Sequence, residues 1–82
     1  MPEFLMPSLG EKMVSGTLVE WLVGPGDRVA RGQAIAVVET SKGAIDVASL
    51  CDGVVEVLLV DEGATVTVGE PLALLAGELV QD

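Results

Sequence analysis

The residue with the clearest chemical potential is Lys42, which lies in the segment Glu39-Thr40-Ser41-Lys42-Gly43 between two apolar runs. A serine, a lysine and a glycine after an extended run are typical of a tight turn, because glycine adopts a positive φ without steric cost. Such a turn would present the Lys42 amine to solvent, where an enzyme could modify it. The alternative is a plain solvated charge at a polar turn, so the position needs further support.

Other kinds of chemistry have few candidate residues. The 82 residues include no histidine and one cysteine, Cys51, so a cysteine nucleophile would have no imidazole base. Cys51 also has no second cysteine for an internal disulfide and no histidine with which to share a metal ion. We therefore interpret Cys51 as structural, predict no metal site and no catalytic residue, and expect a domain that is not itself an enzyme.

The chain is strongly acidic, with 13 carboxylates against four basic residues and a net charge of −9. We expect no nucleic acid and no membrane among its partners, because phosphate backbones and anionic lipids attract clusters of Lys and Arg. The acidity either steers the domain toward basic protein surfaces or only keeps it in solution. The first residues show no basic region followed by an apolar stretch, so we expect no secretory signal, and no apolar run approaches the roughly 18 residues of a membrane span. With its single cysteine, this favours a cytoplasmic location.

The elements that position Lys42 are short. Runs rich in Val, Leu and Ile alternate with Gly, Pro, Asp and Ser, and no run is long enough for a convincing helix. This pattern predicts an all-β fold of many short strands. We expect strands near residues 3–6, 17–23, 28–30, 34–39, 44–49, 54–60, 65–67 and 72–75.

An internal repeat organises these strands. A shift of 37 residues aligns three pairs of glycines: Gly16 with Gly53, Gly26 with Gly63, and Gly32 with Gly69. The repeat predicts a flattened β-barrel or sandwich of two similar four-stranded antiparallel sheets with pseudo-two-fold symmetry, formed by residues 1–82 as a single domain. The same shift carries Lys42 to Leu5 and Leu79 near the chain ends. We therefore expect the Lys42 turn to project from the end of the domain opposite the termini.

Several stretches also carry a family resemblance: Met6-Pro7-Ser8-Leu9-Gly10, Gly16 to Val23, Gly26-Asp27-Arg28-Val29, Glu39 to Gly43, and Gly63 to Gly69. Together they closely resemble the lipoyl domain family of the biotinyl/lipoyl attachment fold, whose members serve 2-oxo acid dehydrogenase complexes. The resemblance implies that Lys42 carries lipoic acid through an amide. It also implies recognition roles for Glu39, Thr40, Ser41 and Gly43, although Ser41 stands where the family usually has Asp and Gly43 where Ala is common.

The resemblance further implies the activity and the partners. A lipoate ligase or lipoyl transferase would load Lys42. The arm would then shuttle acyl groups and reducing equivalents between a thiamine-dependent 2-oxo acid decarboxylase, the acyltransferase core and dihydrolipoyl dehydrogenase. The parent protein would be a dihydrolipoyl acyltransferase, with this chain as an N-terminal fragment, unless the chain is a free-standing carrier.

Three alternatives stay open. They are a biotinyl carrier of a carboxylase, a glycine-cleavage carrier, and a β-sandwich interaction module in which Lys42 is never modified. Biotinyl domains have methionine on both sides of their lysine, so Ser41 and Gly43 disfavour biotin. The short chain disfavours the glycine-cleavage carrier. If the residues flanking Lys42 carry no recognition, the loop from Ser8 to Ser15 is the next region to consider.

Overall fold

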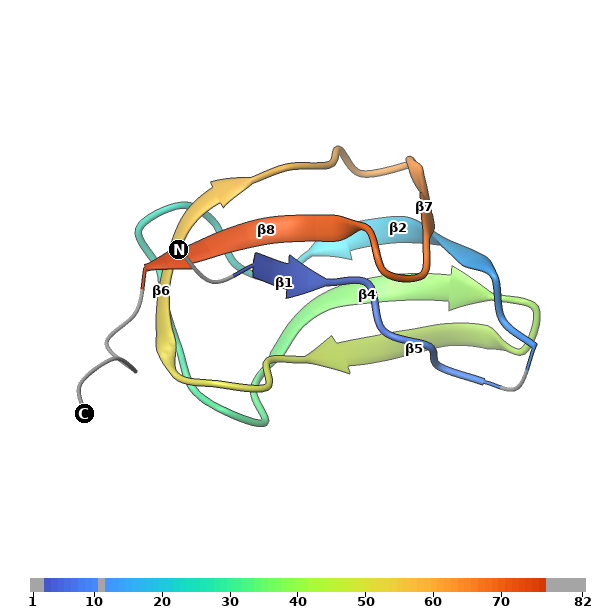
Figure 1. Ribbon diagram of the computed structural model, residues 1–82, viewed down its shortest axis with the longest axis horizontal. Helices are drawn as coiled ribbons and strands as arrows, with labels where there is room; N and C mark the ends of the chain where they lie inside the picture. The colour runs from blue at the N-terminus through green and yellow to red at the C-terminus, as the bar shows by residue number, and fades with distance from the viewer. Residues whose placement is uncertain (1–2, 11, 77–82) are drawn as a thin grey trace.

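The fold consists of two facing four-stranded antiparallel sheets (Figure 1). The computed structural model describes residues 3–10 and 12–76, and every regular element within them is a β-strand. The strands are β1 (Glu3–Leu5), β2 (Ser15–Trp21), β3 (Arg28–Val29), β4 (Ala34–Thr40), β5 (Gly43–Ala48), β6 (Gly53–Leu58), β7 (Thr65–Thr67) and β8 (Pro71–Ala76). The predicted fold class is confirmed.

The order of strands reflects the internal repeat. One sheet has the order β1-β8-β6-β3 and the other has the order β5-β4-β2-β7. The 37-residue shift carries β2, β3 and β4 onto β6, β7 and β8, and it therefore carries one sheet onto the other. The two repeats, β2 to β4 and β6 to β8, also exchange a strand, because β3 pairs with β6 and β7 pairs with β2. Each sheet therefore receives one of its edge strands from the opposite repeat.

The strand boundaries lie within two residues of those predicted. The largest difference is at β2, predicted at residues 17–23, because Gly16 signals a turn in the sequence but pairs with Val66 inside the sheet. A Cβ atom at Gly16 would lie 2.7 Å from Val38 Cγ1 and 2.9 Å from Met6 Cε. Glycine is thus required here by close packing, and not by a turn.

A hydrophobic core fills the space between the sheets. The apolar run in β4 contributes two consecutive buried residues, Ile35 and Ala36, because the pairing with β5 is irregular at this point. Leu72 and Ala73 repeat this arrangement in β8. The buried apolar residues are Phe4, Met6, Leu18, Val29, Ile35, Ala36, Val38, Val47, Val55, Val66, Leu72, Ala73 and Leu75. Small branched side chains dominate this set, as suits two closely packed sheets.

The symmetry of the sheets places the Lys42 hairpin. Phe4 of β1 lies opposite Ala73 of β8, and Val47 of β5 lies opposite Ala36 of β4. Ala36 and Ala73 are equivalent under the 37-residue shift, so Phe4 and Val47, which pair with them, are equivalent as well. β1 is therefore the counterpart of β5, but with an offset of 43 residues in place of 37. The predicted equivalence of Lys42 with Leu5 is therefore wrong by six residues, and Leu79 lies outside the described residues. The expected placement is nevertheless confirmed: the β4–β5 hairpin lies at one end of the molecule, whereas β1 begins and β8 ends toward the other (Figure 1).

The offset between equivalent residues changes from 43 at β1 and β5 to 37 at β2 and β6, which locates an insertion between β1 and β2. Six residues without a counterpart in the second half lie between β1 and β2, in the segment of residues 7–14. In Figure 1 the described parts of this segment, residues 7–10 and 12–14, run past the β4–β5 hairpin. The departure from symmetry therefore falls at the Lys42 end of the domain.

The pseudo-symmetry extends to single hydrogen bonds at two corner turns. The Gly26 N–H donates to the Val55 carbonyl at 2.8 Å, and the equivalent Gly63 N–H donates to the Leu18 carbonyl at 2.6 Å. Both glycines have a positive φ, +93° at Gly26 and +95° at Gly63. No heavy atom beyond the two adjacent residues lies within 4 Å of a Cβ built at either glycine. Backbone conformation alone therefore requires glycine at both positions.

Replacing these glycines should cost backbone strain without a clash. We expect Gly26→Ala and Gly63→Ala each to lower the free energy of unfolding by about 1–2 kcal/mol, because side chains disfavour a positive φ. Chemical denaturation measures the change, and Gly24→Ala is the matched control because Gly24 has no positive φ. An unchanged denaturation midpoint in both variants would contradict this account of the turns.

Candidate modification site

Lys42 occupies the tip of the hairpin between β4 and β5. Thr40 pairs with Gly43, which leaves Ser41 and Lys42 as a two-residue turn in which both side chains are exposed. Neither has a positive φ, which excludes the I′ and II′ turns common in two-residue hairpins. The positive φ lies at Gly43, at +115°. The predicted tight turn, with glycine in the strained position, is therefore confirmed.

A threonine side chain holds this turn. The Lys42 N–H donates to Thr40 Oγ1 at 3.1 Å, and the Thr40 hydroxyl donates to the Gly43 carbonyl at 3.1 Å. One hydroxyl thus bridges the residue that presents the amine and the residue that turns the chain. The family resemblance implies a recognition role for Thr40, which stays a prediction, and the structure gives it a positioning contact within the hairpin.

Two exposed polar residues flank Thr40. Glu39 lies in β4 opposite Thr17 of β2 and Ala44 of β5, and its side chain is exposed. Ser41 is exposed within the turn. Both are therefore accessible to a protein that grips Lys42. Their roles in recognition stay predictions.

Lys42 also borders a groove of about 320 Å³, which the sequence pattern does not predict. The hairpin forms one wall and the segment between β1 and β2 forms the other. The lining residues are Leu9, Gly10, Lys12, Met13, Val14, Ser15, Thr40, Ser41 and Lys42. A Cβ at Gly10 would lie 4.0 Å from Lys42 Nζ, so the amine lies close to this segment.

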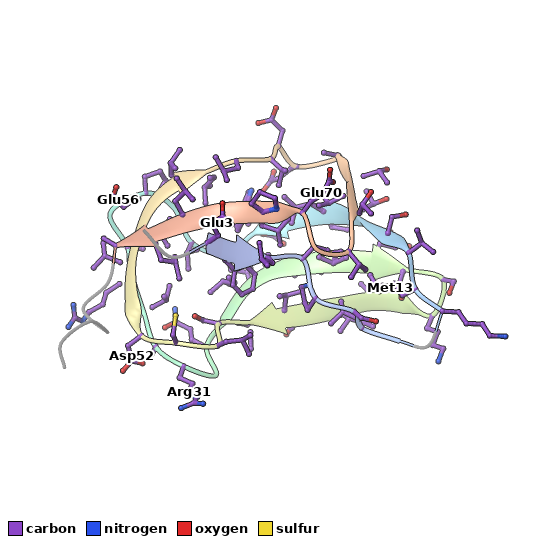
Figure 2. All side chains as sticks on the ribbon, in the orientation of Figure 1. Glu3, Met13, Arg31, Asp52, Glu56 and Glu70 are labelled. Carbon is purple, nitrogen blue, oxygen red and sulfur yellow. The ribbon has the colours of Figure 1, made fainter. Side chains whose placement is uncertain are left out.

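The segment opposite the hairpin is held in place by its own contacts. The Leu9 N–H donates to Met13 Sδ at 3.1 Å, and the Met13 N–H donates to the Gly10 carbonyl at 3.2 Å. Leu9 and Met13 also pack against the core, and Met13 lies on the hairpin side of the molecule (Figure 2). Lys12 has a φ of +62°, the one positive value at a non-glycine residue in the described chain. The break in the 37-residue repeat is the sequence signal that could have identified this segment.

Residues 3–10 and 12–76 offer few side-chain arrangements that could bind a metal ion or act as a nucleophile. They contain no group of three or more His, Cys, Asp or Glu side chains placed to hold a metal ion. Cys51 is free, partly buried and packed against the core. No helix long and apolar enough to cross a membrane occurs in this part of the chain. The feature available for chemistry is therefore an exposed primary amine on a fixed turn.

Comparison with known proteins points to attachment of a prosthetic group. A model of the biotin and lipoyl attachment family, described as "Biotin-requiring enzyme", matches residues 2–75. A dihydrolipoyllysine-residue succinyltransferase component of the 2-oxoglutarate dehydrogenase complex from Staphylococcus saprophyticus is 44% identical over 75 residues, which are 92% of this chain and 18% of that protein. A chloroplastic dihydrolipoyllysine-residue acetyltransferase component of the pyruvate dehydrogenase complex from Arabidopsis thaliana is 38% identical over 90% of this chain and 16% of its own length. The chain thus spans less than a fifth of these relatives.

Solved structures agree with this likeness. The lipoyl domain of the 2-oxoglutarate dehydrogenase complex from Azotobacter vinelandii has a TM-score of 0.73 and 32% identity, with 94% of this chain and 98% of that domain covered. Urea carboxylase from Kluyveromyces lactis has the same TM-score at 22% identity, over 93% of this chain and 6% of that one. The second likeness demonstrates a shared fold alone.

The Thr40 bridge can be tested directly. We expect Thr40→Val to lower the free energy of unfolding by about 1 kcal/mol and to speed hydrogen exchange of the Lys42 amide, because both hydrogen bonds of the hydroxyl are lost. Thr40→Ser retains the hydroxyl and should stay close to the wild type. Amide exchange by NMR and denaturant unfolding measure the two effects, and identical behaviour of the Val and Ser variants would exclude the bridge.

Proposed function

The chain belongs to the biotinyl/lipoyl attachment family, and from this membership we propose that it is a lipoyl carrier domain of a 2-oxo acid dehydrogenase complex, loaded at Lys42. The lipoyl domains of this family bind lipoic acid covalently on a lysine. The observation that carries the assignment to Lys42 is its position, with an exposed side chain at the tip of a two-residue hairpin turn. The other lysine, Lys12, lies in the segment between β1 and β2.

The residues around Lys42 fit such a group. The turn is exposed, so a ligase can reach the amine from the solvent side, and the groove beside it leaves room for a bulky substituent. Formation of the amide removes the positive charge of the lysine. Lipoic acid attached here supplies a disulfide ring that accepts electrons and acyl groups.

The contribution of the chain itself is to position the amine. Thr40 and Gly43 fix the turn, so an enzyme meets Lys42 in one backbone conformation. The start of β1 and the end of β8 lie toward the opposite end, so a tether there leaves the hairpin free (Figure 1). Tethering raises the effective concentration of the carried group at neighbouring active sites. No acid, base or nucleophile from this domain is needed.

Two observations support lipoic acid over biotin. Ser41 and Gly43 flank the lysine where biotinyl domains have methionines. The relatives above 30% identity that are described here are acyltransferase components or a lipoyl domain, whereas the carboxylase is 22% identical. Biotinylation remains the competing outcome in the test of attachment.

The proposal extends to the parent protein and to its partners. We infer that residues 1–82 form one lipoyl domain of a dihydrolipoyl acyltransferase, since relatives of that class match this chain over less than a fifth of their length. Its partners would be the decarboxylase, the acyltransferase core, dihydrolipoyl dehydrogenase and a lipoate ligase. The net charge of −9 favours partners with basic surfaces around their active sites.

Attachment at Lys42 has a direct test. Lys42→Arg should abolish lipoylation by a lipoate ligase, whereas Lys12→Arg should be loaded as fully as the wild type, because arginine keeps the charge but offers no acylable amine. Intact mass spectrometry measures the loading, with a parallel reaction that contains biotin and a biotin ligase. Loading of the Lys42 variant, or biotin in place of lipoate on the wild type, would refute the assignment.

Recognition by charge has a matched pair of variants. Glu39→Gln should lower kcat/KM for lipoylation by up to about fivefold, because an exposed carboxylate contributes a modest interaction with a basic surface. Glu56→Gln removes an exposed charge at the end of the molecule away from the hairpin (Figure 2) and should have no effect.

The same lipoylation rates should also be measured as a function of salt concentration. The difference between wild type and Glu39→Gln should shrink as ionic strength rises, because mobile ions screen exposed charges. Equal rates for both variants at low salt would show that Glu39 only makes the strand polar.

A further inference from the structure

We propose that the groove beside Lys42 is a docking site for the acylated Lys42 side chain, which rests against the segment between β1 and β2 when no partner enzyme holds it. This inference rests on the proposed function and goes beyond it, because a carrier requires an exposed lysine but does not require a resting place for the arm. The candidate occupant is part of the chain itself, since Lys42 is one of the residues that line the groove.

The position and size of the groove suit this occupant. The Lys42 amine lies near Gly10, where a Cβ would be 4.0 Å from Nζ. Glycine at this position adds no side chain of its own next to the amine. The groove volume of about 320 Å³ is at the lower end of the range of roughly 300–1,000 Å³ that is typical of sites for small molecules. A group attached to Lys42 therefore enters the groove without a change in the backbone.

The chemistry of the far wall suits an apolar arm. Leu9, Met13 and Val14 provide apolar surface, and Val14 is 70% exposed although it belongs to a large hydrophobic residue type. The unmodified lysine is charged and gains little from this surface. Formation of an amide removes the charge and adds an apolar chain, whose contact with the wall removes apolar area from water. Docking is thus expected of the modified side chain and not of the free lysine.

The wall is formed before any arm arrives. Met13 Sδ accepts the Leu9 N–H, and the methyl group of Met13 lies 3.1 Å from the Cβ position of Gly16. The Met13 N–H also closes a turn onto the Gly10 carbonyl at 3.2 Å. Because these residues are held by the fold, docking orders the arm but does not have to order the wall, which lowers its entropic cost.

Docking would make the arm a two-state element. Partner enzymes must take the arm out of the groove, so they shift an equilibrium between docked and free forms. The six residues without a counterpart in the second half then acquire a role, because they supply most of the wall. Among the described residues, the end of the molecule where β1 begins and β8 ends has no comparable insertion.

The test compares the unmodified and lipoylated domain by NMR, with the loading established by intact mass. We expect lipoylation to shift the amide signals of Leu9, Gly10, Met13 and Val14 as well as those of the hairpin. We also expect nuclear Overhauser contacts between the arm and the methyl groups of Val14. In Val14→Ser the shifts in the segment between β1 and β2 should fall to a small fraction of their wild-type size.

Leu50→Ser is the matched control. Leu50 is a similarly exposed apolar residue, at 75%, but it lies between β5 and β6 and does not line this groove. Its replacement should leave the arm contacts and the shifts unchanged. Denaturation of both variants separates docking from folding, because substitutions at such exposed positions have little effect on stability.

The outcomes distinguish this inference from the function on which it rests. Full loading with shifts confined to Ser41, Lys42 and Gly43 would overturn docking and leave the carrier function intact. Equal loss of the arm contacts in the Val14 and Leu50 variants would also overturn it. Absence of loading at Lys42 would overturn the proposed function and the docking together.

Discussion

The exchange of β3 and β7 between the two sheets is the constraint on which the rest of this small structure depends. Each of these short strands hydrogen-bonds to a strand of the opposite half, β3 to β6 and β7 to β2. Neither sheet is thus complete until both repeats of the chain have folded against each other. The corner turns at Gly26 and Gly63 direct the chain into these exchanged strands, and each is hydrogen-bonded to the strand that receives it. Formation of the sheets, the core and the exchange is therefore one cooperative event.

This cooperativity explains how so small a core can support a rigid hairpin. β4 pairs with β2 on one side and with β5 on the other, so it is anchored within its sheet along its length. Val38, two residues before Thr40, is fully buried. Val38 is the last buried residue of β4, and together with the hydrogen bonds of Thr40 it restricts the backbone conformation of the turn. The site is thus an extension of the core, although its reactive group lies in solvent.

Much of this architecture follows from local sequence patterns. Eight strands, the glycine turns and an exposed Lys42 could be predicted because apolar runs and glycines act over a few residues. The exchange of β3 and β7 could not, because hydrophobic periodicity does not specify the partner of a strand. The sequence pattern predicts Gly16 outside β2 because glycine usually interrupts strands, whereas in the structure it makes room for Met6 and Val38. The groove could not be predicted because it depends on the proximity of two segments that are distant in sequence.

The near-symmetry of the scaffold has a consequence for recognition. A body with a pseudo-two-fold axis presents two ends that are alike in backbone, so an enzyme that read only the sheets would dock in two orientations, one of them unproductive. What distinguishes the ends is the closed hairpin with its lysine and the six extra residues beside it. Discrimination between a productive and a reversed encounter therefore comes from these unsymmetrical parts and from the exposed side chains that differ between the repeats, such as Arg28 and Thr65. The surface that a partner reads can be small, because the scaffold needs to supply no directional information.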